Sequence, residues 1–256
     1  MAQPSLSVVV PVYNEERELP VLLGALGSAL DDLGLHGEIL VVDNASTDDT
    51  RGAAAPFLDR GVRYLRNDAN RGKGYSIRRG MLEATGELRL MCDADCAPSL
   101  AALPRMVELA GQIDVVVGSR VASGARVDRQ QPLRRRFFGL GFLILTRLIM
   151  GRLTRDVYCG FKLWRAEAAE AVFARVQIEG WVFDAEALAL AQALGYRVRE
   201  TGIPWINRPA SRLSIGEVLV PAARELVRAR RHVRAEAARG ASAGDGLVPN
   251  RVEAGS

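Results

Sequence analysis

Lysine is scarce in this sequence. Of the 34 basic residues among its 256 residues, only Lys73 and Lys162 are lysines, so arginine supplies nearly all of the positive charge. A lysine that persists among arginines is explained either by chance or by a position that needs a compact ammonium and has no room for a planar guanidinium. Under the second hypothesis both lysines are candidate functional residues.

Cysteine is also scarce, and its pattern argues against two kinds of stabilising site. The three cysteines, at positions 92, 96 and 159, are an odd and sparse set that does not indicate a disulfide framework. Cys92 and Cys96 are too isolated to indicate a zinc site. The first residues, MAQPSLSVVV, contain neither a charged n-region nor a long apolar core, so we expect no signal peptide. These features predict a protein of the reducing cytoplasm.

The sequence also has no apolar run that is long enough to span a bilayer. The almost wholly apolar run FFGLGFLILTRLIM, residues 137–150, would make a helix of about 21 Å, which is shorter than the roughly 30 Å of a bilayer core. It can be a buried core helix. Because Arg134–Arg136 precede it and Arg147 and Arg152 lie within and after it, an interfacial position at residues 134–153 is favoured. We therefore expect peripheral attachment to the inner face of the cell membrane.

The charge of the chain points to anionic partners. Net charge is +4, and arginines gather at residues 134–136 and between residues 224 and 239. Phosphate, nucleic acid and a lipid surface all suit such a distribution. Basic residues that bind nucleic acid are commonly interleaved with exposed aromatic residues, which is not the pattern here. The sequence therefore favours phosphate or lipid over nucleic acid.

The order of apolar runs predicts an α/β fold. Runs without polar alternation are separated by segments with helical periodicity, which is typical of a mostly parallel, doubly wound sheet with helices on both faces. The predicted strands are residues 6–10, 38–42, 62–65, 88–92, 114–118 and 196–205, and the predicted helices include 15–33, 74–85, 100–110, 166–175 and 184–194.

Four polar stretches follow the first four predicted strands. They are PVYNEE (11–16), VDNASTDDT (42–50), NRGKGYS (70–76) and MCDADC (91–96). Because the carboxyl ends of parallel strands meet at one edge of a sheet, we expect these stretches to line one crevice. Each stretch alone can be a turn or a cap; Thr47 or Asp48, for example, can cap the following helix. Asp43 can cap its own loop or accept hydrogen bonds from a nucleotide base.

The pair Asp93 and Asp95 indicates a metal site. Two carboxylates one residue apart repel each other unless a cation lies beside them. Mg²⁺ or Mn²⁺, bound by one or two carboxylates together with substrate phosphates, resolves this conflict. The alternative is that Asp95 caps the helix that follows Pro98. Lys73 opens a helix between two glycines, where free N–H groups favour anions, but neither a Walker A loop nor a GxGxxG sequence is present.

In this order, the four stretches resemble those of inverting family 2 glycosyltransferases with the GT-A fold. The resemblance covers about residues 5–215. Four later segments narrow it to polyprenyl-phosphate sugar transferases, in particular the dolichyl-phosphate glucosyltransferase group: GSR (118–120), DVYCGFKLWR (156–165), GWVFDAE (180–186) and RPASRLS (208–214).

The resemblance implies transfer of a hexose, glucose from UDP-glucose, to a polyprenyl (dolichyl-type) monophosphate, with Mg²⁺ or Mn²⁺ as cofactor. A GDP-mannose-dependent mannosyltransferase, or a family 2 transferase with another acceptor, is the alternative. The implied nucleotide-sugar site comprises Pro11, Tyr13, Asn14, Glu15, Asp43, Lys73, Asp93, Ala94 and Asp95, with the metal on Asp93 and Asp95. The implied acceptor-phosphate site comprises Arg120, Arg134 and Arg212. The implied catalytic residues are Asp184, Glu186 and Arg120.

The chemistry of the acceptor limits the role of Asp184. A lipid monophosphate is already mostly ionised at neutral pH, with a second pKa of about 6, so a strong general base is not needed. Asp184 precedes the helical stretch AEALALAQAL, and a helix N-terminus keeps a carboxylate ionised. It therefore suits a hydrogen-bond acceptor that orients a hydroxyl and not a proton donor. A plain helix cap is the alternative.

The expected organisation is a catalytic domain over residues 1–208, a basic helical extension over 209–239 and a disordered tail over 240–256. Two other function classes are weighed. A nucleotidyltransferase shares a similar sheet and metal site, but the N-terminal glycine-rich, basic loop expected of that class is missing. A non-catalytic binder of nucleotide sugars or acidic lipid differs only in making no product.

Overall fold

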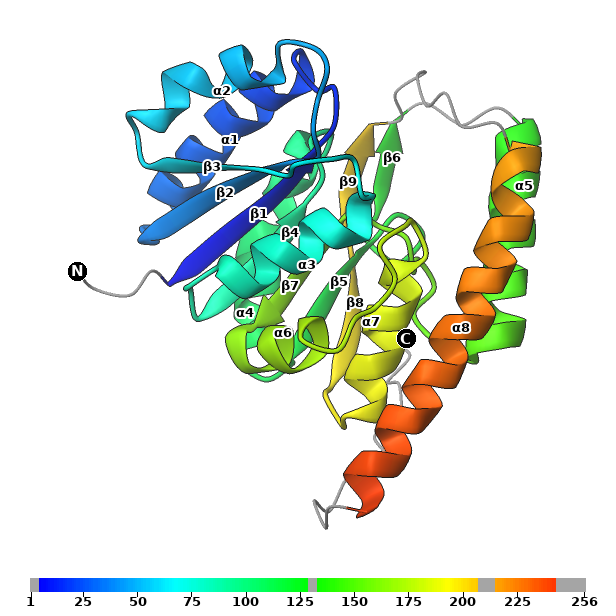
Figure 1. The fold of residues 1–256 in the computed structure, drawn as a ribbon. Helices are drawn as coiled ribbons and strands as arrows, with labels where there is room; N and C mark the ends of the chain where they lie inside the picture. Colours follow the sequence, from blue (N-terminus) through cyan, green and yellow to red (C-terminus); the bar gives the residue numbers. More distant parts are fainter. Residues whose placement is uncertain (1–4, 129–132, 207–214, 243–256) are drawn as a thin grey trace.

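The β-branched, apolar runs of the sequence form one central sheet. The computed structural model describes residues 5–128, 133–206 and 215–242. Seven strands follow the order β3-β2-β1-β4-β7-β5-β8 (Figure 1). Their bounds are β1 (Leu6–Val12), β2 (Gly37–Asp43), β3 (Val62–Arg66), β4 (Leu88–Cys92), β5 (Val115–Ser119), β7 (Phe161–Arg165) and β8 (Val198–Gly202). The two short strands β6 (Arg126–Asp128) and β9 (Pro204–Ile206) pair separately.

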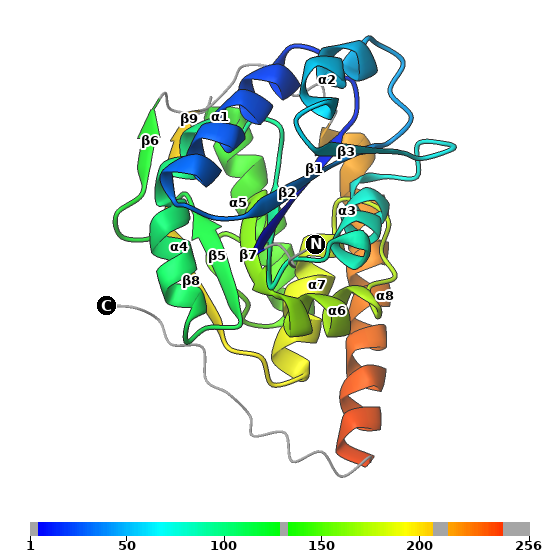
Figure 2. The same cartoon turned by 90° about the vertical axis from the view of Figure 1, so that its left-hand side faces the viewer.

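Helices cover both faces of this sheet (Figures 1 and 2). One face carries α1 (Glu18–Asp32), a 3₁₀ helix (Ala97–Ala102) and α4 (Leu103–Ala110), with α2 (Thr50–Leu58) packed on α1. The other face carries α3 (Lys73–Glu83), α6 (Ala166–Phe173) and α7 (Phe183–Ala193). The predicted α/β class with helices on both faces is confirmed.

Two apolar clusters, one on each side of the sheet, form the core. Successive side chains of a strand point to opposite faces, so Val8 and Val10 of β1 pack in one cluster with Leu19 of α1. Val9 packs in the other cluster with Ile77 of α3. Burial on both faces is the reason why these strands show no polar alternation in the sequence.

One strand departs from the parallel arrangement. β7 lies antiparallel between β4 and β5, with Phe161 opposite Cys92 and Lys162 opposite both Met91 and Val117. This segment belongs to the motif DVYCGFKLWR, and it was not predicted as a strand because it is short and leads directly into α6. Its insertion brings Lys162 to the end of β4, where the paired carboxylates follow.

Three further expectations about secondary structure were wrong in detail. The expected strand over residues 196–205 divides into β8, which joins the main sheet, and β9, which pairs with β6. The polar stretch after Arg120 contains β6, which was not expected. The cap of α2 is Asp49, whose carboxylate accepts a hydrogen bond of 3.2 Å from Gly52 N, and neither Thr47 nor Asp48.

Two helices lie beside the α7 edge of the molecule (Figure 1). The apolar run forms α5 (Leu133–Met150), and the basic extension forms α8 (Ile215–Ser242), which packs on α5 and α7. Residues 240–242 are thus helical and do not belong to the disordered tail expected there, while 243–256 lie outside the described residues. Among the helices that the structure describes, none has the length and apolar character needed to cross a bilayer.

Candidate active site

The four polar stretches meet at one edge of the sheet. The strands β1, β2, β3 and β4 are mutually parallel. β2 and β3 lie on one side of β1 and β4 lies on the other, so the direction of strand order reverses at β1. In an open α/β sheet, ligands bind outside the carboxyl ends of the strands at such a reversal. The structure therefore brings the predicted site segments together at that position.

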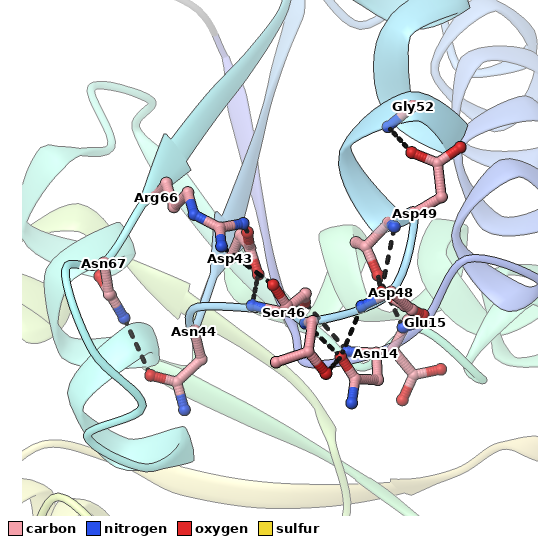
Figure 3. Close-up of polar contacts among 12 residues, drawn as sticks. Asn14, Glu15, Asp43, Asn44, Ser46, Asp48, Asp49, Gly52, Arg66 and Asn67 are labelled. Carbon is pink, nitrogen blue, oxygen red and sulfur yellow. Dashed lines mark hydrogen bonds and ion pairs between the residues drawn. The ribbon is translucent and has the colours of Figure 1, made fainter.

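The first two stretches brace each other (Figure 3). Asn14 has a positive φ of 58°, a conformation that asparagine tolerates better than most residues. Its Oδ1 accepts hydrogen bonds from Thr47 N at 2.7 Å and Asp48 N at 3.3 Å, and its own N donates to Ser46 Oγ at 3.0 Å. Glu15 N donates to Thr50 Oγ1 at 2.9 Å. These bonds fix the shape of the two loops that follow β1 and β2.

Asp43 occupies the end of β2 and is fully buried. Ser46 N donates to its Oδ1 at 2.8 Å, and Arg66, its neighbour in register on β3, forms an ion pair with Oδ2. Both carboxylate oxygens therefore have partners within the protein, as the loop-capping alternative predicted. Arg66 was not identified from the sequence, because the pairing of β2 with β3 is needed to place it beside Asp43.

Pro11 and Tyr13 lie at the end of β1. Pro11 is within the strand, opposite Val42 of β2, and Tyr13 follows it with 44% of its surface exposed. An exposed aromatic ring next to the two braced loops offers a surface on which a flat base can stack.

An amide network extends from the second stretch to the third. Asn44 Oδ1 accepts hydrogen bonds from Asn67 Nδ2 and from Arg71 N, each at 3.1 Å, and Asn67 also donates to Ser76 Oγ at 2.9 Å. Figure 3 shows the contact between the two asparagines. Sequence reasoning missed Asn67, although its place at the end of a strand was the available signal.

Lys73 and Asp93 form an ion pair at the centre of the site. Their Nζ–Oδ2 distance is 2.6 Å. Burial works to lower the pKa of Lys73, but the charges of Asp93 and Asp184 outweigh it and hold that pKa above its ordinary value. The ammonium is thus a fixed positive charge between the start of α3 and the end of β4.

Asp93 has little room and one unpaired atom. Its Oδ1 is buried and has no hydrogen-bond partner. Asp93 N donates to Gly160 O at 2.9 Å, and a Cβ added to Gly160 would lie only 1.9 Å from Asp93 Oδ2. Gly160 is therefore required because the carboxylate fills the space of a side chain.

Ala94 and Asp95 complete this stretch. Ala94 is buried and Asp95 is half-buried. The residue that caps the following 3₁₀ helix is Cys96, without a side-chain cap hydrogen bond, so the alternative role of Asp95 as that cap is not seen. In the part of the chain that the structure describes, no cluster of three or more metal-ligating side chains is present.

The start of α3 lies against the segment that leads into α7. Gly72 has a φ of 104°, and a Cβ on it would lie 2.4 Å from Glu179 O; on Gly74 it would lie 2.5 Å from Ile178 O. The two glycines that flank Lys73 thus permit close backbone contact. Lys73 Nζ consequently lies 5.7 Å from the ring centre of Trp181, which is 54% exposed.

Asp184 pairs with the second lysine of the chain. Lys162 forms a buried ion pair with Asp184 Oδ1 and donates to Cys159 O at 2.5 Å. Burial raises the pKa of Asp184 above its ordinary value, against the opposing charges of Lys162 and Lys73. The cap of α7 is Val182, so Asp184 is not the cap that the sequence left open. Its environment is set by burial and two lysines as well as by the helix N-terminus.

Glu186 is buried two residues further along the same helix. Its Oε2 accepts hydrogen bonds from Gln177 N at 3.0 Å and Ile178 N at 2.8 Å, while Oε1 is buried without a partner. Burial raises its pKa above the ordinary value. In this structure Glu186 holds the segment that packs against α3, and its implied catalytic role stays a prediction.

Arg120 is held by Asp156. Its Nε and Nη2 donate to the two carboxylate oxygens at 2.8 and 2.7 Å, and its backbone N donates at 2.8 Å. The guanidinium lies 5.3 Å from the ring centre of Trp205. Burial works to raise the pKa of Asp156, but the hydrogen bonds and charge of Arg120 together lower it. Arg134 lies in α5 with its side chain outside the described part, and Arg212 lies outside the described residues altogether.

Comparison with known proteins identifies the class. The family model described as Glycosyl transferase family 2 matches residues 7–173, about two thirds of the chain, and the chain belongs to this family. The Dictyostelium discoideum protein named dolichyl-phosphate beta-glucosyltransferase is 32% identical over 243 residues, which cover 88% of this chain and 73% of that protein. The mouse protein of the same name is 34% identical, over 81% of this chain and 69% of that protein.

Solved structures support the fold. Glucosyl-3-phosphoglycerate synthase from Mycobacterium tuberculosis, in a complex with Mn²⁺, UDP-glucose and phosphoglyceric acid, superposes with a TM-score of 0.64 at 19% identity, over 90% of this chain and 80% of that chain. The expected GT-A arrangement is thereby confirmed. The chain is a glycosyltransferase of family 2, and the strand-end cluster described above is its candidate active site.

Proposed function

We propose that this chain catalyses the inverting transfer of glucose from UDP-glucose to a polyprenyl (dolichyl-type) monophosphate. The observation that carries the proposal is the similarity to dolichyl-phosphate beta-glucosyltransferases at 32–34% identity over more than four fifths of the chain. The site geometry supports it, because one sheet edge offers a base-stacking surface, paired carboxylates and fixed cations.

The nucleotide lies, in this proposal, across the ends of β1 and β2. The exposed ring of Tyr13 contacts the base, and the braced loops around Asn14 and Glu15 present backbone groups to the nucleoside. Asp43 already has partners for both oxygens, so it acts by shaping its loop together with Arg66.

Asp93 and Asp95 are proposed to hold Mg²⁺ or Mn²⁺. The buried, unpaired Oδ1 of Asp93 fits such a role, since a buried carboxylate oxygen without a partner is costly. Two protein carboxylates leave the remaining positions of the ion to water and substrate phosphates, which is usual for Mg²⁺. When bound, the ion neutralises charge on the diphosphate leaving group. The Mn²⁺ in the synthase complex is in keeping with this assignment.

Lys73 and Arg120 are proposed to bring the two phosphate groups together. Lys73 supplies a permanent positive charge beside Asp93, on the donor side. The side chain of Arg120 is 28% exposed, and its contacts with Asp156 fix its orientation. A guanidinium has five N–H donors, and the side-chain contacts with Asp156 use only some of them. The donors that Asp156 does not use are proposed to bind the acceptor phosphate, which attacks as an anion without a general base.

Attachment to a membrane surface is a further part of the proposal. On α5, Leu140, Ile144 and Leu148 are 54%, 48% and 79% exposed and, at a spacing of four residues, form one stripe. Phe142 and Leu143 of the same helix pack against the core. Within α5, the stripe is therefore the part of the predicted interfacial segment that we propose to contact lipid, while the side chains of Phe137 and Phe138 lie outside the described part.

The neighbouring helix α8 adds positive charge to this side of the molecule. A shallow groove on its surface is lined by Ala223, Arg224, Val227, Arg228 and Arg231. Each basic residue near an anionic surface contributes about 1 kcal/mol, and an exposed apolar stripe adds burial in the acyl region. Peripheral binding at the inner face of the cell membrane therefore remains our prediction.

The proposal is tested with radiolabelled UDP-glucose and GDP-mannose, each offered with a polyprenyl phosphate and, as a control, with the unphosphorylated polyprenol. We expect label from UDP-glucose in the organic phase only with the phosphate. A product from GDP-mannose would favour the mannosyltransferase alternative. Release of pyrophosphate from a sugar phosphate and a nucleoside triphosphate would indicate a nucleotidyltransferase. Binding of the nucleotide sugar without any product would indicate a non-catalytic binder.

A further inference from the structure

Lys162 is a lysine buried in the middle of the sheet. It lies on β7 between Met91 of β4 and Val117 of β5, and its side chain is 1% exposed. An unpaired ammonium in such a position would be strongly destabilising. Lys162 avoids this cost through two contacts, the Cys159 carbonyl at 2.5 Å and the Asp184 carboxylate. Its head group therefore has one well-defined position.

Fold stability alone gives a weak reason for this ion pair. The surrounding cluster is apolar and includes Phe183 and Trp164. A buried ion pair adds little net stability compared with apolar side chains of similar volume, because two charges must be removed from water. The pair is better explained by what Asp184 does in the site.

Asp184 lies next to the donor side of the site. The residue before it, Phe183, has its ring centre 6.0 Å from Lys73 Nζ, and Lys73 in turn contacts Asp93 at 2.6 Å. Four charges of alternating sign thus follow one another from β7 to the end of β4. Lys162 Nζ donates to Oδ1 of Asp184, and this contact determines the direction in which the rest of the carboxylate faces.

We propose that Lys162 is a positioning residue that orients Asp184 toward the sugar of the nucleotide donor, and that it influences the reaction only through Asp184. The inference rests on the proposed function for the identity of the donor. The ammonium is compact enough to be enclosed between β4 and β5, which gives the scarcity of lysine a physical meaning at this position.

A double-mutant cycle tests the proposal. Lys162→Met and Asp184→Asn are each expected to lower kcat for transfer by at least about 100-fold, since a small misplacement of a contact to the reacting group has effects of that size. If Lys162 acts only through Asp184, the double variant will be no slower than Asp184→Asn within about threefold. A double variant more than about tenfold slower than Asp184→Asn would overturn the proposal, because Lys162 would then act independently.

The comparison is protected against misfolding. Each single variant leaves one buried charge without its ion-pair partner, whereas the double variant has no buried charge at either position, so kcat is compared only between preparations whose thermal unfolding shows a folded protein. The comparison of the double variant with Asp184→Asn alone decides the question. Arg89→Met is the matched control: Arg89 is a 3% exposed cation on β4 that pairs with Glu170 and bonds Met81 O. It should lose stability with kcat unchanged.

A binding measurement separates failure of this inference from failure of the proposed function. Calorimetry with UDP-glucose and with UDP gives the affinity that the sugar adds. We expect Lys162→Met and Asp184→Asn to reduce that added affinity by similar factors and to leave UDP binding unchanged. A wild-type protein that binds UDP-glucose without transferring to polyprenyl phosphate would refute the acceptor but not this inference. Unchanged sugar affinity in both variants would refute the inference.

Discussion

Gly160→Ala changes a single hydrogen into a methyl group at the most crowded point of the site. The added Cβ would lie 1.9 Å from Asp93 Oδ2 and 2.2 Å from Cγ. An ordinary contact needs about 3.4 Å, so the carboxylate must retreat by about 1.5 Å or the backbone of β7 must shift. The retreat would disturb the contact between Asp93 Oδ2 and Lys73 Nζ, which is 2.6 Å.

The expected magnitudes follow from this geometry. Overpacking of this kind costs about 1–3 kcal/mol of folding free energy. A displacement of about 1 Å at a group that binds the reacting substrate can cost about 100-fold in rate. We therefore expect Gly160→Ala to remain folded, with kcat/KM for glucosyl transfer reduced by about 100-fold or more.

The assay combines organic-phase extraction of the labelled product with thermal unfolding of the same preparation. Gly24→Ala is the matched control, because Gly24 is exposed on α1 and a Cβ there would meet nothing within 4 Å. That variant should keep wild-type kcat/KM. A folded Gly160→Ala protein with wild-type kcat/KM would refute the reasoning, since Asp93 could then move without consequence.

Four other outcomes are expected. Asp95→Asn should abolish transfer with an unchanged melting temperature, and full activity in chelator would contradict the metal assignment. Arg120→Ala should raise KM for the polyprenyl phosphate far more than KM for UDP-glucose. Equal effects on both KM values would mean that Arg120 binds the nucleotide or has only a structural role. The pKa of Asp156 is lowered in the folded state, so its ion pair with Arg120 stabilises the protein fully at pH values above the ordinary carboxyl pKa of about 3.9. This stabilisation is lost as the pH falls through the lower pKa of the folded state. The melting temperature of the wild type should therefore exceed that of Asp156→Asn by a constant amount between pH 7 and about 5, and by less below about pH 4. Replacing Leu140, Ile144 and Leu148 together by Ser should reduce sedimentation with anionic liposomes without changing stability. The control Val21→Ser, on the exposed face of α1, should leave sedimentation unchanged. Unchanged sedimentation of the triple variant would place the membrane contact elsewhere.

Much of the site could be located from the sequence because the relevant signals are local. A run such as LSVVV is apolar throughout only if both faces of the strand are buried, and this predicts a parallel sheet. The position of Asp93 directly after such a run places it at the carboxyl edge, where ligands bind. Lys73 was singled out by its rarity, and it lies in contact with Asp93.

The partners of these residues could not be predicted in the same way. Arg66 reaches Asp43 only because β2 and β3 pair in one particular register. The exposed face of α5 is likewise decided by α8 and the core: both Phe142 and Leu148 are apolar, yet the first packs inward and the second is 79% exposed.

The sequence by itself determined the class of the fold, the edge of the sheet that carries the site and the residue types available there. Each depends on short-range patterns of burial and on side-chain chemistry at strand ends. Only the tertiary structure decided that β7 enters the sheet antiparallel and that Lys162 thereby meets Asp184. These contacts join residues that are distant in the chain, and their geometry depends on strand order and packing, which no local pattern specifies.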